Sequence, residues 1–339
     1  MRKQETWTKR LRTRWLELLL LAGFVGLVVW LGVAMTPVVR SMLPPASPTA
    51  TVTPLPTAIS TPEPTPASTP MSSAEKFDGQ RALQHVVAQM AVGPRPSGSA
   101  AGRETGNYII AQLRGQGWQV EEQEFVYRGV QGRNIVGKAG TGPVALIGAH
   151  YDTRRLADND PDPALRTEPV PGANDGASGV AVLLELARTL DKTRLSNEVW
   201  LTFFDAEDNG RLDGWDFIAG STEMASRLTV TPEMVVIADM VGDRDLQLYK
   251  ERNSTPQLVE RIWSIAARLG YEGVFLPTAK WSMLDDHTPF LQKGIPAVDL
   301  IDFDYPYWHT TQDTTDKVAP ESLEQVGRVL QVLLEGEDE

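Results

Sequence analysis

Several histidines and acidic residues lie where apolar segments of the chain end. His150 and Asp152 directly follow the apolar run 144–149. In an extended chain both side chains of a His-x-Asp pair leave on the same face, so one can bind a metal ion while the other orients or supports it. A strand that ends on a solvated aspartate would show the same spacing. This motif alone therefore leaves both interpretations open.

The same pattern recurs further along the chain. Asp175 lies in a glycine-rich loop before a helical pattern, Glu207 and Asp208 follow a second apolar run, Asp239 ends a third, and His309 follows a fourth. Singly, each acid is more often a helix cap or a solvated loop residue, and Asp175 could cap the helix after it. Together, histidines and carboxylates suit one or two zinc ions that share a bridging carboxylate and a water molecule.

These side chains need a scaffold that brings strand ends together. Helical spacing predicts helices over 82–92, 101–113, 179–190, 256–269 and 321–334, and apolar or alternating runs predict strands over 118–127, 134–138, 144–149, 199–204, 233–238 and 296–301. Strands that alternate with helices predict an α/β fold of three layers, α/β/α, with a mostly parallel mixed central sheet. Ligands bind beyond the carboxyl ends of such strands.

Composition narrows the class of protein. The chain has 339 residues, of which 42% are hydrophobic, enough for a substantial core. Its formal net charge of -12 argues against a nucleic-acid partner, since phosphate binding needs clustered Lys and Arg. The absence of cysteine excludes disulfides, thiolate zinc sites and a cysteine nucleophile. Any metal ion must then be held by His, Asp and Glu.

The first 72 residues predict a membrane anchor and a stalk. Residues 1–17 form a basic tail, and 18–39 are uncharged and mostly apolar, long enough to cross a hydrocarbon core of ~30 Å at ~1.5 Å per residue. The positive-inside rule predicts a cytoplasmic N-terminus and a single transmembrane helix in the cell membrane. A cleaved signal peptide is the alternative, but its apolar region is usually shorter. Residues 40–72, rich in Pro, Thr and Ser, form the stalk, and 73–339 form an extracytoplasmic catalytic domain.

From about residue 75 onward, the motifs around these strand ends resemble the zinc aminopeptidases of the aminopeptidase Y family in peptidase clan MH. The resemblance implies a zinc exopeptidase-like fold. It also implies that His150 and Asp239 bind one zinc ion, that Asp175 bridges, and that Asp208 and His309 bind a second ion. Glu207 would be the general base, with Asp152 beside it in the catalytic set. The family usually has Glu-Glu where this chain has Glu207-Asp208, which shortens the reach of the second carboxylate.

Three other segments, 203–207, 284–291 and 308–310, resemble animal-type glutaminyl cyclases. That resemblance implies a single zinc ion on Asp175, Asp208 and His309. It also implies substrate contacts from the residues Asp286, His287 and Trp308. Asp286 and His287 are equally typical of a helix N-terminus.

We expect, on the ligand types, a two-zinc aminopeptidase that hydrolyses N-terminal residues from peptides and proteins. A one-zinc cyclase that forms N-terminal pyroglutamate is the alternative. A catalytically inactive binding ectodomain would be expected to lose Glu207 or a metal ligand, and none is plainly lost. A serine hydrolase would need a Gly-x-Ser-x-Gly nucleophile elbow, which the chain lacks.

Overall fold

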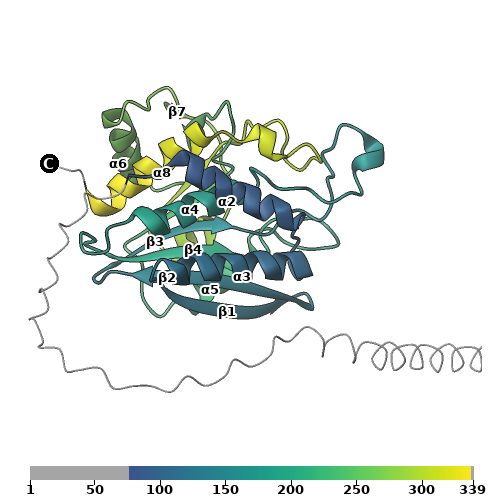
Figure 1. Cartoon of the computed structure of the whole chain (residues 1–339), viewed down its shortest axis with the longest axis horizontal. Coiled ribbons are helices and arrows are strands. Elements are labelled where there is room, and N and C mark those ends of the chain that lie inside the picture. The colour runs from purple at the N-terminus through teal and green to yellow at the C-terminus, as the bar shows by residue number, and fades with distance from the viewer. Residues whose placement is uncertain (1–75, 337–339) are drawn as a thin grey trace, which may run out of the picture. The chain divides into compact units, whose positions relative to one another are not determined.

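A computed structural model describes residues 76–336 (Figure 1). The helices are α2 (Gly79–Val92), α3 (Ala100–Gly115), α4 (Ala177–Thr189), α5 (Ala219–Arg227), α6 (Pro256–Arg268), α7 (Thr288–Gln292) and α8 (Pro320–Glu335). The strands are β1 (Gln119–Tyr127), β2 (Val130–Ala139), β3 (Val144–His150), β4 (Glu198–Phe204), β5 (Met234–Asp239), β6 (Leu248–Lys250), β7 (Phe275–Ala279) and β8 (Ala297–Ile301). Two short 3-10 helices cover Pro163–Leu165 and Thr315–Lys317.

Six strands form one sheet in the order β1-β2-β4-β3-β5-β8. Strands β4, β3, β5 and β8 run parallel, while β2 pairs antiparallel with β1 and β4. Strand β3 is central and all seven of its residues are buried, which explains why it reads as an uninterrupted apolar run. The predicted mostly parallel mixed sheet is confirmed.

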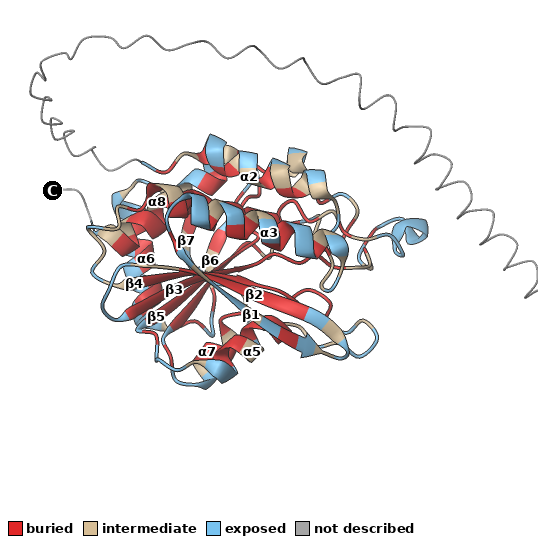
Figure 2. Ribbon diagram, turned by 60° about the horizontal axis from the view of Figure 1, so that its bottom comes forward, coloured by how far each residue is buried: buried red, intermediate tan, exposed pale blue. Residues whose placement is uncertain are grey.

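Helices cover both faces of this sheet, which confirms the predicted three layers (Figure 2). On one face, apolar side chains of α2, α4 and α8 pack with Ile147 and Val236 in the larger core. On the other face, Met224 of α5 and Phe290 of α7 pack with Leu146 and Ile237. Alternate residues of β3 and β5 thus point into two separate cores, as the period of a strand requires.

The sheet register aligns the ends that carry the candidate site. His150 at the end of β3 lies level with Phe204 at the end of β4, and Asp239 at the end of β5 lies level with Ile301 of β8. Because these four strands are parallel, the loops that follow them emerge at one edge of the sheet. The scaffold therefore gathers residues that are distant in sequence.

The sequence did not predict α5, β6, β7 and α7. Helix α5 has nine residues, begins at Ile218 in the left-handed region, and has no side-chain cap, so the usual start signals are missing. Strand β6 has three residues, and three of the five residues of β7 are exposed, which removes the apolar run that marks a buried strand. These elements depend on contacts distant in sequence.

The predicted basic tail, transmembrane helix and stalk all lie outside the described residues. Between residues 76 and 336 no helix is both long enough and apolar enough to span a membrane. The N-terminal anchor and its topology stay predictions.

Candidate metal centre

Five side chains with metal-binding atoms meet at the carboxyl edge of the sheet. His150 ends β3, Asp239 ends β5, Asp208 follows β4, Asp175 precedes α4 and His309 follows β8. None is more than 7% exposed. The structure thus brings together all five residues that the sequence proposed as ligands, in two groups that share Asp175.

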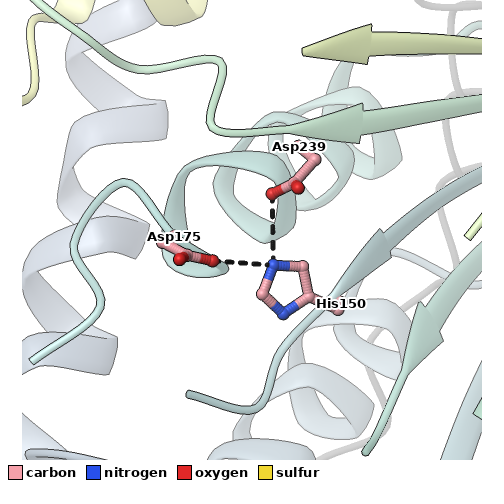
Figure 3. Close-up of side chains that lie close together, drawn as sticks. All are labelled: His150, Asp175 and Asp239. Carbon is pink, nitrogen blue, oxygen red and sulfur yellow. Dashed lines mark hydrogen bonds and ion pairs between the residues drawn. The ribbon is translucent and has the colours of Figure 1, made fainter. Parts of the chain in front are cut away.

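The first group is built around the ring of His150 (Figure 3). Its Nε2 lies 3.1 Å from Oδ1 of Asp239 and 3.2 Å from Oδ1 of Asp175. Both carboxylates thus contact the same ring nitrogen. These three residues could hold one metal ion.

The second group is built around the ring of His309. Its Nε2 lies 2.8 Å from Oδ1 of Asp208 and 3.8 Å from Oδ2 of Asp175. On the other side of the ring, Nδ1 lies 3.8 Å from Oδ1 of Asp158, whose carboxylate receives two hydrogen bonds from Arg154. A carboxylate behind a histidine is the usual support for a metal ligand. Arg154 and Asp158 follow no sequence pattern that would mark them as part of the site.

Two carboxylate oxygens in the second group are buried without a hydrogen-bond partner, Oδ2 of Asp175 and Oδ2 of Asp208. A buried, unpaired anionic oxygen costs free energy unless a proton or a cation neutralises it. Donor atoms of the three residues lie within 4.8 Å of one another, a spacing that one ion can span. Catalytic zinc sites usually have three protein ligands and leave a fourth position open, and two carboxylates with an imidazole are a set of that kind. The second group therefore fits zinc.

Asp152 organises the turn that carries Glu207 and Asp208. Its two carboxylate oxygens accept hydrogen bonds from the backbone N–H groups of those residues, at 3.0 and 3.2 Å. Its Oδ1 also lies 3.7 Å from Nδ1 of His150. Asp152 therefore positions other site residues, and it is absent from the residues that line the pocket.

The loop that carries Asp175 is held by groups that the sequence analysis did not identify. Asp313 accepts hydrogen bonds from the backbone N–H groups of Asn174 (2.8 Å) and Asp175 (3.1 Å), and from the hydroxyl of Tyr305 (2.7 Å). The next residue, Gly176, has φ of 90°, and a Cβ there would lie 2.9 Å from the backbone oxygen of Asp152. Only glycine fits that approach without strain.

Backbone strain is concentrated around the site. Ala206, Met240 and His309 all have positive φ, at 61°, 47° and 58°. All three belong to the site or adjoin it. Ala206 precedes Glu207, Met240 follows Asp239, and His309 is itself a candidate ligand. Non-glycine residues in this region cost of order 1–3 kcal/mol each and persist where surrounding contacts enforce them. The fold therefore enforces the directions of these side chains.

Electrostatics in the site favour a proton-carrying role for Glu207. Burial raises the pKa of Glu207 well above its ordinary value, and Asp208 and Asp285 add to this rise while His150 opposes it. Burial lowers the pKa of His150, but Asp239 and the hydrogen-bonded carboxylates of Asp152 and Asp175 outweigh it and raise that pKa well above its ordinary value. A carboxyl whose pKa is raised toward neutrality can exchange protons with substrate.

A cavity of about 170 Å³ opens beside the metal centre. It is lined by Asp175, Glu207, Asp208, Arg211, Phe217, Asp239, Met240, Met283, Leu284, Asp285, Ile301, Phe303, Trp308 and His309. The floor is acidic and the walls are mostly apolar. The ring of Trp308 stacks on that of His309, with centroids 3.8 Å apart.

Trp308 lines this pocket, as the sequence analysis expected, but Asp286 and His287 do not. Both are completely buried, and Asp286 faces Ser221 of α5. The acid that reaches the pocket from this segment is Asp285, which lines it together with Asp239. In this segment it is therefore Asp285, and not Asp286, that lines the pocket. His287 precedes α7 at its N-cap position without a side-chain capping bond.

Comparison with known proteins agrees with this architecture. The family model described as Peptidase family M28 matches residues 134–334, a span that includes all five candidate ligands. The chain belongs to peptidase family M28. Zinc dependence is a property of this family, and the fold is that of zinc exopeptidases and glutaminyl cyclases.

Relatives within the M28 family have names of two kinds. A glutaminyl-peptide cyclotransferase-like protein of Bos taurus is 27% identical over 281 residues, which cover 71% of each chain. Tannerella forsythia glutaminyl cyclase, known from a crystal structure, has 32% sequence identity to this chain and a TM-score of 0.72. The match covers 78% of this chain and 100% of that one. A Zn-dependent exopeptidase from Parabacteroides distasonis is 31% identical with a TM-score of 0.73, over the same shares.

Proposed function

We propose that this M28 protein is a glutaminyl-peptide cyclotransferase that converts N-terminal glutaminyl residues of peptides to pyroglutamate on one zinc ion. The observation that carries the proposal is the unequal state of the two ligand groups. In the first group, Nε2 of His150 is within 3.2 Å of both carboxylates, and the atom left buried without a partner is the other ring nitrogen, Nδ1. In the second, the unpaired buried atoms are anionic oxygens, one each of Asp175 and Asp208. One ion on Asp175, Asp208 and His309 would neutralise both of these oxygens.

The pocket supports the same reaction. Its small volume, apolar walls and the indole of Trp308 suit one uncharged side chain, such as that of glutamine, placed against the second ligand group. Zinc bound there would polarise the side-chain amide carbonyl. Three acids on the floor, Glu207, Asp239 and Asp285, can carry the protons that cyclisation must move.

The proposed reaction needs one proton relay and no water. The α-amine nitrogen attacks the side-chain amide carbon, and a C–N bond forms. Glu207 accepts the proton that the amine loses and then donates it to the amide nitrogen, which leaves as ammonia. Asp239 lines the same pocket as Glu207, and its carboxylate orients the α-amine.

An aminopeptidase with two zinc ions is the second candidate, favoured by one specific observation. The first group also has its donor atoms within 4.8 Å of one another and shares Asp175 with the second. Two ions bridged by that carboxylate could activate water for peptide hydrolysis, with Glu207 as general base.

A direct assay separates the two. The purified chain is incubated with zinc and a peptide that begins with Gln, and with matched peptides that begin with Leu or Ala. Cyclisation of the Gln peptide releases ammonia and blocks the N-terminus of that peptide without removing a residue. Mass spectrometry of the peptides shows these changes. Release of the first residue from the Leu or Ala peptides, without ammonia from the Gln peptide, would overturn the proposal in favour of the aminopeptidase.

A further inference from the structure

A third group of buried side chains lies behind the pocket floor. It consists of Asp285, His287 and Asp299, called here the α7 cluster, whose donor atoms lie within 4.8 Å of one another. Asp285 and His287 come from the segment before α7, and Asp299 lies on β8. All three are at most 4% exposed. None belongs to either ligand group at the catalytic edge.

The α7 cluster is short of hydrogen-bond partners. Both ring nitrogens of His287 and both carboxylate oxygens of Asp299 are buried with no partner. The ring faces Asp299, with Nδ1 3.8 Å from Oδ2, and on its other side Nε2 lies 3.5 Å from Oε2 of Glu251. These distances are too long for good hydrogen bonds. The distance from Nδ1 to Asp299 does suit a shared ion, because two atoms each ~2.1 Å from one zinc ion lie roughly 3–4 Å apart.

The charges around the cluster also favour a cation. Glu251 is an anion, since the nearby imidazole of His287 and hydrogen bonds from the backbone of Asn253 and Met283 outweigh burial and lower its pKa to about 2. Burial raises the pKa of Asp299 well above its ordinary value, and the charge effects that add to the rise all come from carboxylates. A group of buried carboxylates around one imidazole is costly unless positive charge is added.

We propose that the α7 cluster is a second metal site, separate from the catalytic centre, that binds one divalent transition-metal ion through Asp285, His287 and Asp299. Two carboxylates and one imidazole, with no thiolate, suit Zn²⁺ or Mn²⁺. The ion joins the segment before α7 to β8. Because Asp285 also lines the pocket, a bound ion fixes the position of one pocket wall.

Metal content of the full chain tests this inference. After dialysis against Zn²⁺ alone, the chain is measured by inductively coupled plasma mass spectrometry as wild type, Asp299→Asn and Asp286→Asn. Asp286 is the matched control, a buried carboxylate of the same segment that is outside the cluster. We expect Asp299→Asn to hold one ion fewer per chain, and Asp286→Asn to hold as many as the wild type. Equal metal content in wild type and folded Asp299→Asn would overturn the proposal.

Anomalous diffraction from crystals of the wild-type chain shows whether the α7 cluster binds a metal ion, even if Asp299→Asn does not fold. With Zn²⁺ or Mn²⁺ present, we expect a peak about 2.0–2.2 Å from donor atoms of all three residues. A water molecule, or no density, at that position would overturn the site. Neither result depends on turnover: a peak without ammonia release refutes only the proposed cyclase, and ammonia release without a peak refutes only this site.

Discussion

At the scale of single residues, Glu207 lies where the proposed reaction needs a proton carrier. It lines the pocket next to Asp208, and its backbone N–H is fixed by the carboxylate of Asp152. A glutamine at this position keeps the shape and the hydrogen-bonding capacity of the side chain but cannot take up a proton. Chemistry and folding can therefore be tested separately.

We predict that Glu207→Gln lowers kcat by at least ~100-fold with zinc content unchanged, because general acid–base catalysis typically contributes 10²–10⁴-fold. Steady-state kinetics and a zinc count check this. Glu260→Gln, at an exposed position of α6, is the control and should leave kcat unchanged. Near-normal turnover by Glu207→Gln would remove Glu207 from the mechanism.

Substitution of His150 distinguishes a centre with one catalytic ion from a centre with two. If only Asp175, Asp208 and His309 hold zinc, His150→Ala should keep the catalytic ion, whereas His309→Ala should lose it. Zinc content of the two variants, measured beside the wild type, checks this prediction. Loss of an ion in both variants would instead support the bridged pair of the aminopeptidase.

At the scale of elements, the loop before α4 has to present Asp175 at a fixed place. Asp313, from the segment after β8, holds the backbone of this loop from a position 138 residues away in sequence. Its carboxylate satisfies two backbone N–H groups and the hydroxyl of Tyr305. The loop is thus fixed by a tertiary contact, not by its own sequence.

Asp313→Ala should destabilise the fold by about 1–3 kcal/mol, the cost of leaving buried donors unsatisfied, and should lower zinc affinity. Denaturant unfolding and zinc titration measure the two effects. Tyr305→Phe removes one donor and keeps the carboxylate, so it should cost less on both measures. An equal loss in the two variants would contradict the assigned role of Asp313.

Helices α2 and α3 are joined by His85 and Tyr108, with Nδ1 of His85 2.6 Å from the hydroxyl. Burial lowers the pKa of His85 from 6.5 to about 4. Between these two pH values the unfolded chain binds more protons than the folded chain, so the contribution of His85 to stability falls as pH falls from 6.5 toward 4.

A fully buried group with this shift would contribute roughly 3 kcal/mol, at ~1.4 kcal/mol per pKa unit, and the partial exposure of His85 reduces the effect to about 1–2 kcal/mol. We predict that His85→Gln, which does not titrate, loses less stability than the wild type over this pH range. Urea unfolding at several pH values compares the two chains. Parallel pH profiles would show that His85 does not contribute.

At the scale of the whole molecule, we predict that the domain after residue 72 is tethered outside the cell by the apolar run 18–39, since basic residues precede the run. Protease added to intact cells should cut the Pro/Thr/Ser-rich segment and release an active domain. A cytoplasmic marker protein in the same cells is the control and should stay uncut. Protection of the domain until the membrane is permeabilised would contradict this topology.

The layered α/β fold could be predicted from the amino-acid sequence alone, and so could the meeting of the five candidate ligands at one edge of the sheet. Buried parallel strands must be apolar along their whole length, so β3, β4, β5 and β8 are visible as runs, and the polar residue that ends each run marks the carboxyl edge of the sheet. Packing in three dimensions was needed to show that Asp285 reaches the pocket while Asp286 turns toward α5. It was also needed to show that Asp313 holds the Asp175 loop and that Asp299 faces His287. No local pattern encodes these contacts, because the direction of a side chain and its partners across long stretches of sequence depend on how the layers pack.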